Sequence, residues 1–354
     1  MSTNIQKNQI TEGIIWRQLL LFFFPILLGT FFQQLYNTID SVIVGQFVGK
    51  EALAAVGGSS AQIVAFVVGF FTGLSSGASV TIAQFFGAKD SRSANKGLHT
   101  AYAIAAFGGL ILTVSGIILT PFLLEMMNTP ADIVADSAVY LRIYFAGIIF
   151  VLIYNMGSAI LRATGDSKRP LYYLIVCCII NIVLDVLFVI VFHMGVMGVA
   201  VATLIAQAVS AVLVTLKLMR SEGILKLSVK QIRFHGSILK MQLKLGLPTG
   251  FEAILFSITN IAIQSAVNTS AYGKLDAIFW MVSTAFGIAI TTFVGQNYGA
   301  GKMDRVRKST RVCLLMDFIV SAVLVVFLIA ARFLLFRLFT NDSHVIEIGC
   351  DMLV

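Results

Sequence analysis

Residues 22–37 read FFFPILLGTFFQQLYN, and residues 245–260 read LGLPTGFEAILFSITN. When Pro25 is placed over Pro248, both stretches continue as apolar segments and both end on asparagine. Six apolar segments separate the equivalent points, so the two copies have the same topology. A parallel repeat of this kind is typical of transporters in which two halves enclose a solute cavity. The pair therefore predicts an all-helical fold of two lobes.

A second pair of matching stretches supports the repeat. QFFGAK (84–89) aligns with QNYGAG (296–301), and the matches keep their order along the chain. The second copy is shorter than the first between its two landmarks, so we expect a clipped connection between its first two helices. The small residues of GLSSGAS (73–79) predict close packing between helices rather than ligand contacts.

The composition excludes a soluble protein. Hydrophobic residues make up 58% of the 354 residues, charged residues only 12%, and the mean hydropathy is +0.92. A soluble domain carries roughly 25% charged residues.

The net charge of +8 does not indicate a nucleic-acid partner. The basic residues lie in short stretches between apolar runs, without the interleaved aromatic residues that grip single strands.

Nine apolar segments are long enough, at ~1.5 Å per residue, to cross or nearly cross ~30 Å of hydrocarbon. We place them at 15–45, 53–85, 97–124, 133–161, 170–192, 195–219, 240–268, 276–296 and 308–338, with the start of a tenth at 345–354. The connections are short, except for the polar stretch 220–239. The sequence thus predicts a polytopic membrane protein.

The basic residues predict its orientation. With a cytoplasmic N-terminus, 20 of the 25 lysines and arginines fall on the cytoplasmic side, as the positive-inside rule requires. These stretches are 1–17, 86–100, 162–169, 217–244 and 297–311. We therefore expect a multi-pass protein of a bacterial inner membrane, with its N-terminus inside.

Three parts follow from the repeat and the segments. We place an N-lobe of six helices at 1–222, a cytoplasmic linker at 223–239 and a partial C-lobe at 240–354. The second lobe stops inside what should be its fourth helix, so we expect a chain that is incomplete at its C-terminal end. A truncated product without transport activity is one alternative.

The cysteines and histidines show no spacing typical of a disulfide framework or a metal site. We interpret the cysteines as small buried hydrophobes, and they are Cys177, Cys178, Cys313 and Cys350. The histidines are scattered near helix ends or in loops, and they are His99, His193, His235 and His344. An intramembrane enzyme would need histidines or a comparable set of catalytic residues within the helices, so we expect a protein without enzymatic activity.

Four acids fall within the apolar segments: Asp40, Asp185, Glu252 and Asp317. An ionised carboxylate in hydrocarbon costs at least ~2.5 kcal/mol on insertion scales. Each of these acids therefore needs a partner or a function that offsets this cost. Asp40 and Asp185 both lie toward the outer ends of their segments, where they can meet. Two carboxylates in one dry site cannot both stay ionised cheaply, so a proton or a cation must join them.

Neutral oxygens near this pair would complete a site for a hard cation. Asn181 lies one helical turn before Asp185 on the same face, and Asn155 and Thr203 lie on neighbouring segments. A bland alternative is that Asp40 caps a kink or pairs with a nearby polar group. We expect a structural role for Asp317. For Glu252, a structural role and a role in ion or substrate binding are about equally expected.

Several motifs together resemble one family, the multidrug and toxic compound extrusion (MATE) transporters, and most closely its DinF-like bacterial branch. They are LGTFFQQLYNTIDSVIVGQFVGKEALAAVG (28–57), RATGDSKRP (162–170), NIVLDVLF (181–188), LGLPTG (245–250) and TTFVGQNYGAGK (291–302). The resemblance covers nearly the whole chain.

The resemblance implies twelve helices in two lobes of six, which export organic, often cationic, drugs in exchange for Na⁺ or H⁺. It also implies that Asp40, Asn181 and Asp185 form the coupling-ion site, with Thr203 as a further ligand. Other branches use an acid of the C-lobe, for which Glu252 is a candidate, and Asn155 is a second candidate for ion or substrate contact.

The leading hypothesis is therefore an antiporter, coupled through Asp40 and Asp185, that bends its first helix at Pro25 as it works. It needs no cofactor beyond its coupling ion. We expect a monomer that binds lipophilic or cationic small molecules in the bilayer. A flippase for a lipid-linked precursor is the alternative within the superfamily, but it would need basic residues lining the cavity, and the apolar segments offer almost none beyond Arg142.

Overall fold

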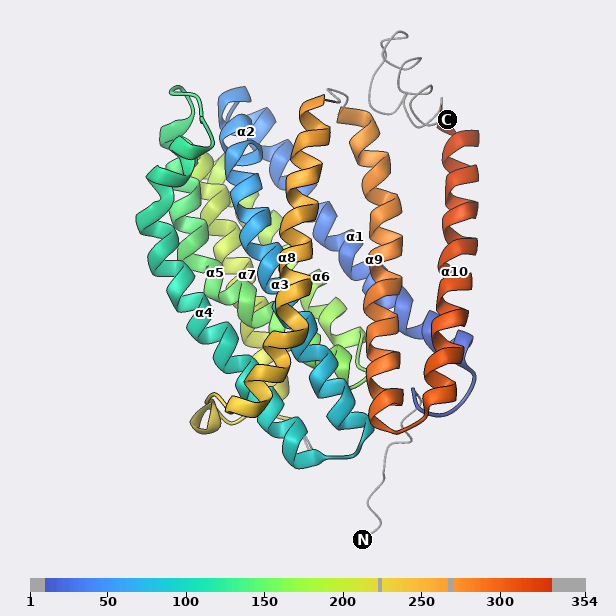
Figure 1. The fold of residues 1–354 in the computed structure, drawn as a ribbon. Coiled ribbons are helices and arrows are strands. Elements are labelled where there is room, and N and C mark those ends of the chain that lie inside the picture. The colour runs from blue at the N-terminus through green and yellow to red at the C-terminus, as the bar shows by residue number, and fades with distance from the viewer. Residues whose placement is uncertain (1–9, 222–224, 267–269, 333–354) are drawn as a thin grey trace.

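The computed structural model of the protein describes residues 10–221, 225–266 and 270–332, and within them the side chains outside 260–278. Nine long helices of this described part run side by side, joined mostly by short turns (Figure 1). They are α1 (Ile15–Phe47), α3 (Ser59–Gly87), α4 (Ser91–Met126), α5 (Val134–Ala163), α6 (Lys168–Asp185), α7 (Gly195–Met219), α8 (Gly236–Ala266), α9 (Ser270–Gly299) and α10 (Met303–Ala330). Shorter elements are α2 (Lys50–Gly57), the π-helix η1 (Val186–Val191) and the 3-10 helix η2 (Val229–Gln231). The predicted all-helical fold is confirmed.

Eight helical spans of the described residues are long and apolar enough to cross a membrane. The side chains of α8 are described only as far as residue 259, and this part of the helix carries Lys240, Lys244 and Glu252. The start of a tenth segment at 345–354 lies outside the described residues.

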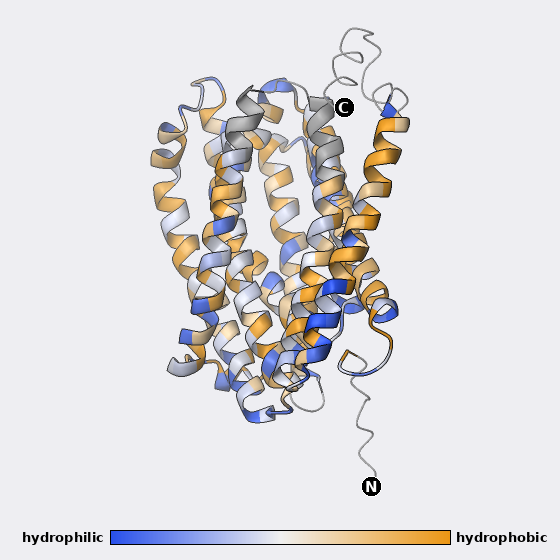
Figure 2. Cartoon of the chain, turned by 45° about the vertical axis from the view of Figure 1, so that its right-hand side comes forward, coloured by the Kyte–Doolittle hydropathy of each residue, from blue (hydrophilic) through white to orange (hydrophobic). Residues whose placement is uncertain are grey.

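The outer surface of the bundle is apolar. On α10, Leu314, Phe318 and Val326 are each more than 60% exposed, and Figure 2 shows apolar residues along most of the length of the helices. A soluble protein rarely exposes contiguous apolar surface of this extent, because burying it from water is favourable. The chain is a multi-pass membrane protein whose lipid-facing side chains point outward.

Two predicted segments are divided in the structure. The segment predicted at 53–85 is two helices, α2 and α3, which meet at Gly58. A side chain at Gly58 would lie 2.6 Å from the Ala54 carbonyl oxygen, so the break needs a glycine. The segment predicted at 170–192 begins as α6 and continues as the π-helix η1.

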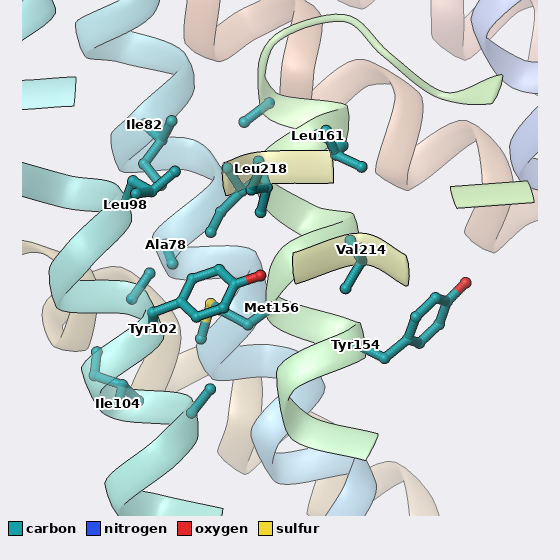
Figure 3. Packing of buried hydrophobic residues seen from close by; sticks show 14 of the residues in the cluster. Ala78, Ile82, Leu98, Tyr102, Ile104, Tyr154, Met156, Leu161, Val214 and Leu218 are labelled. Carbon is teal, nitrogen blue, oxygen red and sulfur yellow. The ribbon is translucent and has the colours of Figure 1, made fainter. Parts of the chain in front are cut away.

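The main core lies between α3, α4, α5 and α7. Tyr102 of α4, Met156 of α5 and Val214 and Leu218 of α7 are buried in one cluster there (Figure 3). The cysteines that the structure describes, Cys177, Cys178 and Cys313, are buried and free, as predicted, and Cys350 lies outside the described residues.

Helix α1 takes part in two other cores, because it crosses the bundle diagonally (Figure 1). Its N-terminal half packs against α9 and α10, where Phe23 stacks on Phe286 with ring centroids 4.0 Å apart. Its C-terminal half, including Val44, packs against α2, η1 and α7. Pro25 lies within the first of these halves, and the helix continues through it. A displacement of one end of α1 therefore reaches both halves of the molecule.

Close glycine contacts join the two halves along α3. Side chains at Gly73 and Gly77 would collide with the backbone of α8 at Gly250 and Gly246. This confirms the predicted close packing of 73–79, since only residues without a β-carbon let two helix backbones approach so closely.

The two repeated stretches QFFGAK (84–89) and QNYGAG (296–301) contact each other reciprocally. A β-carbon on Gly87 would collide with the carbonyl oxygen of Gln296, and one on Gly299 would collide with that of Gln84. Gln84 and Gly87 are the residues that the repeat alignment places over Gln296 and Gly299. Equivalent residues meet in this way when two copies are related by a near two-fold axis, so the contact supports the repeat.

Candidate functional site

The four residues expected to form an ion site come together inside the N-terminal half. Asp40 lies on α1, Asn181 and Asp185 on α6, and Thr203 on α7. All four are buried, and Asp185 has no exposed surface. Helix α1 and the consecutive helices α6 and α7 thus place two carboxyl groups, an amide and a hydroxyl in one dry region.

Polar contacts connect the four side chains. The Asn181 amide donates to the Thr203 hydroxyl at 3.5 Å, and that hydroxyl donates to Asp40 Oδ2 at 3.5 Å. Asp40 and Asp185 lie within direct interaction range of each other. Both bonds are at the long limit for hydrogen bonds, so they hold the Asp40 carboxylate only weakly, and neither of them reaches Asp185.

We call the group formed by Asp40, Asn181, Asp185 and Thr203 the acid cluster. Several hydrogen-bond acceptors in it have no donor. Within the described part of the chain, Asp40 Oδ1, Asn181 Oδ1 and both carboxyl oxygens of Asp185 are buried without a hydrogen-bond partner. An unpaired buried acceptor costs free energy, and an unpaired buried carboxylate costs more. A cluster that gathers acceptors in this way is stabilised when a proton or a cation enters it.

The backbone changes at the same place. Asp185 is the last residue of α6, and the π-helix η1 begins at Val186. The Phe192 N–H donates to the Leu187 carbonyl, a step of five residues instead of four. Single π-turns within helices occur frequently at functional sites, because the wider turn changes the direction of neighbouring side chains.

Further polar residues lie beside the acid cluster that the sequence analysis did not single out. Gln207 of α7 donates to the hydroxyl of Tyr36 on α1 at 3.4 Å, and Gln207 Oε1 is buried without a donor. Tyr140 of α5 interacts electrostatically with both aspartates. Their spacing was a usable signal, because Tyr36 lies four residues before Asp40 and Gln207 four residues after Thr203.

Other candidate residues lie elsewhere. Asn155 is half-buried on α5, and no hydrogen bond in the described residues joins it to the acid cluster. Glu252 is exposed on α8, which packs on α3 and α4 rather than on the helices of the cluster. Asp317 lies on α10 in the other half. Neither Asn155 nor Glu252 is a member of the acid cluster.

The chemistry of the donor set fits a hard cation or a proton. Two carboxylates, an amide carbonyl and a hydroxyl are oxygen ligands, which suit Na⁺ rather than soft metals. The same two carboxylates can instead share one proton. No group of three or more His, Cys, Asp or Glu side chains suited to a metal ion occurs in the described residues.

Comparison with known families finds one match. The MatE family model matches residues 25–187 and 248–353. Its two matched segments begin at Pro25 and Pro248, the two residues that the repeat alignment superimposes. This agreement further supports the two-copy organisation.

Curated relatives share more than the family motif. A probable multidrug resistance protein YoeA of Bacillus subtilis (strain 168) is 30% identical over 96% of this chain and 77% of its own length. The probable multidrug resistance protein YpnP of the same strain is 32% identical over 85% of this chain and 69% of its own length.

Among solved structures, an outward-facing multidrug resistance MATE family transporter of the MOP superfamily superimposes with a TM-score of 0.91. It is 23% identical, and the match covers 99% of this chain and 80% of that one. The folds therefore agree over nearly all of the chain.

Proposed function

The chain belongs to the MATE family of multidrug efflux transporters, and we propose that it works as an antiporter coupled through the acid cluster. It would move lipophilic or cationic organic compounds outward while Na⁺ or H⁺ enters. The names of its relatives, which are multidrug resistance proteins, support this class of substrate.

One observation carries the proposal: the unpaired buried acceptors of Asp40, Asn181 and Asp185. With a proton or a cation between the two carboxylates, α1 can stay packed against α6. Without it, two like charges face each other in a medium that does not screen them, and the packing weakens. The ion thus stabilises one arrangement of α1 more than the other, which is the differential affinity that a population shift requires.

The diagonal path of α1 gives this shift a route to the packing between the two halves. Asp40 lies in the half of α1 that packs in the N-terminal lobe, whereas Phe23 packs against Phe286 of α9 in the second half. Pro25 lies near the second contact and lacks the N–H of a regular helix turn, so α1 can bend there at low cost. We propose that ion binding changes this bend and, with it, the packing between the halves.

The proposed orientation places the N-terminus and the basic connections in the cytoplasm of a bacterial cell. Connections that carry lysines and arginines lie at the same end of the bundle as the start of α1, the lower end in Figure 1. Basic loops of this kind are retained on the cytoplasmic side.

Efflux measurements test the proposal. In cells that lack their own exporters, or in proteoliposomes, Asp40→Asn should lose efflux of a cationic dye driven by a Na⁺ or pH gradient, because an amide cannot exchange a proton or balance a cation. The matched control is Asp317→Asn, an acid of α10 outside the cluster, which should retain ion-driven efflux.

Imposing the Na⁺ gradient and the pH gradient separately identifies the coupling ion. The proposal is wrong if Asp40→Asn retains the full response to both gradients, or if Asp317→Asn loses it to the same extent.

A further inference from the structure

A pocket lined by basic residues lies at the lower end of the bundle, away from the acid cluster. It is a pocket of about 930 Å³ between the first turns of α4 and the segment that follows α7. Ser91, Arg92, Asn95, Lys96 and His99 line it from α4, at helical spacing that places them on one side of the helix. Lys230, Gln231, Arg233 and His235 line it from the other side. We call it the basic pocket.

Hydrogen bonds hold the two sides of the basic pocket together. The backbone N–H of Ser228 donates to His99 Nε2 at 3.0 Å, and the Asn95 amide donates to the carbonyl of Lys226 at 3.2 Å. Leu225 and Leu227 are buried in the main core. The segment 225–235 is therefore docked on α4, and the pocket is a built feature of the fold.

Each of the two histidines of the pocket accepts a hydrogen bond at Nε2. His99 Nε2 accepts from Ser228, so its Nδ1 carries the proton and donates to the Asn95 carbonyl at 2.8 Å. His235 Nε2 accepts from Arg233 Nε at 3.2 Å, which leaves its Nδ1–H to contact the Thr100 hydroxyl at 3.1 Å. Desolvation, with smaller contributions from Arg233 and Lys96, lowers the pKa of His235.

Four cations of the pocket form no salt bridge within the described residues: Arg92, Lys96, Lys230 and Arg233. Of these, Arg92 interacts electrostatically with Asp90. The ion pairs found in the described residues, Arg169–Asp166 and Arg307–Asp304, lie elsewhere. Asp90 is the acid nearest to the pocket in the sequence, and its carboxylate caps α4 by accepting from the Ser93 N–H at 3.0 Å. Positive charges from two chain segments therefore converge on one cavity, as in sites for phosphate groups.

An apolar strip adjoins the charged cavity. Phe234 follows Arg233 directly and is 46% exposed, and its ring packs edge-on against Phe107 of α4, with centroids 6.0 Å apart. Phe107 is itself 56% exposed on the outer surface of the bundle. A free phosphate ion has no apolar part that could contact these rings, whereas the acyl chains of a lipid need an apolar surface next to the headgroup site.

We propose that the basic pocket binds the phosphate-bearing headgroup of an anionic membrane lipid, whose acyl chain lies along Phe107 and Phe234. Arg92 and Lys96 contact the headgroup from α4, and Lys230 and Arg233 contact it from the segment 225–235. The lipid bridges α4 and the connection between the two lobes, so it fastens this connection to the N-terminal lobe. The inference depends on membrane embedding and not on the coupling mechanism.

Lipid binding by the purified full chain tests the proposal. The protein in a nonionic detergent is titrated with phosphatidylglycerol and, separately, with zwitterionic phosphatidylcholine, and the bound lipid is counted by native mass spectrometry. Arg92→Gln with Lys230→Gln removes one cation from each side of the pocket. Since each basic residue near a membrane surface adds appreciably to anionic-lipid binding, we expect an affinity loss of about tenfold or more for phosphatidylglycerol alone.

The matched control is Lys308→Gln with Arg311→Gln, which removes two exposed cations from α10 at the same end of the bundle. It should bind phosphatidylglycerol as the unaltered protein does. Equal binding by the pocket variant and the control overturns the proposal, as does equal binding of the two lipids by the unaltered protein.

A second arm distinguishes the lipid from free phosphate. Phe234→Ser removes only the exposed ring, and it should weaken phosphatidylglycerol binding several-fold without changing the binding of inorganic phosphate. If inorganic phosphate displaces the lipid at millimolar concentration and Phe234→Ser has no effect, the ligand is a soluble phosphate-bearing anion and the lipid proposal is wrong.

Discussion

The acid cluster and the basic pocket are opposite in charge and in depth. Within the described residues, the acid cluster contains buried acceptors that have no donors, whereas the basic pocket contains cations that form no salt bridge and are mostly exposed. Water screens exposed charges, so an unpaired cation at the surface costs little. A buried carboxylate has no such screening, and its cost is several times larger.

Because the two sites differ in depth, a proton or cation in the acid cluster and an anionic headgroup in the basic pocket should have different effects. In the proposed mechanism, the acid cluster needs its proton or cation in order to keep its packing, so occupancy can change the conformation of α1. The surface pocket keeps its shape through hydrogen bonds of its own, so occupancy adds affinity between parts that are already docked. We therefore expect large effects of substitutions at the first site and small effects at the second.

The largest effect on stability is expected from Asp185→Asn. In Na⁺-free buffer at alkaline pH, this change removes one of two facing carboxylates and should stabilise the folded protein by up to about 2.5 kcal/mol. It should also abolish the rise in melting temperature that Na⁺ or acidification gives the unaltered protein. Thermal unfolding with and without Na⁺ measures both, and Asp317→Asn is the control. An unchanged response to Na⁺ and pH in Asp185→Asn would refute the shared-ion interpretation.

A smaller effect is expected from Thr203→Val. Valine keeps the shape of threonine but removes the hydroxyl that accepts from Asn181 and donates to Asp40. Losing a hydrogen bond of this kind costs about 1 kcal/mol, which corresponds to roughly fivefold weaker ion binding. The control is Thr120→Val, whose hydroxyl bonds only within α4. If both variants bind the ion equally well, Thr203 is not a ligand.

The smallest effect is expected at His235 in the basic pocket. Its pKa in the folded protein lies below the ordinary value of 6.5, so the unfolded or undocked segment binds more protons. Its contribution to docking is complete above about pH 6.5 and is lost as the pH falls below that value. Amide hydrogen exchange of segment 225–235, corrected for intrinsic rates, should therefore speed up at acidic pH in the unaltered protein.

His235→Gln keeps a hydrogen-bonding side chain but cannot titrate, so its corrected exchange rates should change less with pH. Added phosphatidylglycerol should slow exchange in both proteins. Identical pH dependence with and without the histidine would show that its ionisation does not affect the docking of this segment.

Much of the acid cluster was predictable because it depends on local spacing and depth. Asn181 and Asp185 lie one turn apart, and Asp40 and Asp185 fall at matching depths of their segments, so they were expected to meet. The same spacing rule would have added Tyr36 and Gln207. The π-helix after Asp185 was not predictable, since VLFVIV (186–191) has no residue that distinguishes a wide turn from a regular one.

The basic pocket could not be predicted, because its two sides are far apart in the sequence. Arg92 and Lys96 precede Lys230 and Arg233 by more than a hundred residues, and each pair alone fits the general excess of basic residues in such connections. Only the docking of segment 225–235 on α4 brings them together. The break at Gly58 was missed for a related reason. The short stretch GGSS (57–60) lies within a longer run that is apolar on average, and a hydropathy pattern does not show a change of direction.

The most direct test of the central claim is isothermal titration of the purified protein with Na⁺, repeated in two buffers of different ionisation enthalpy. The account predicts that Na⁺ binds, or that protons take its place at the same centre, and that the double variant Asp40→Asn, Asp185→Asn shows neither ion uptake nor proton exchange. Ion binding of undiminished affinity by the double variant would contradict it.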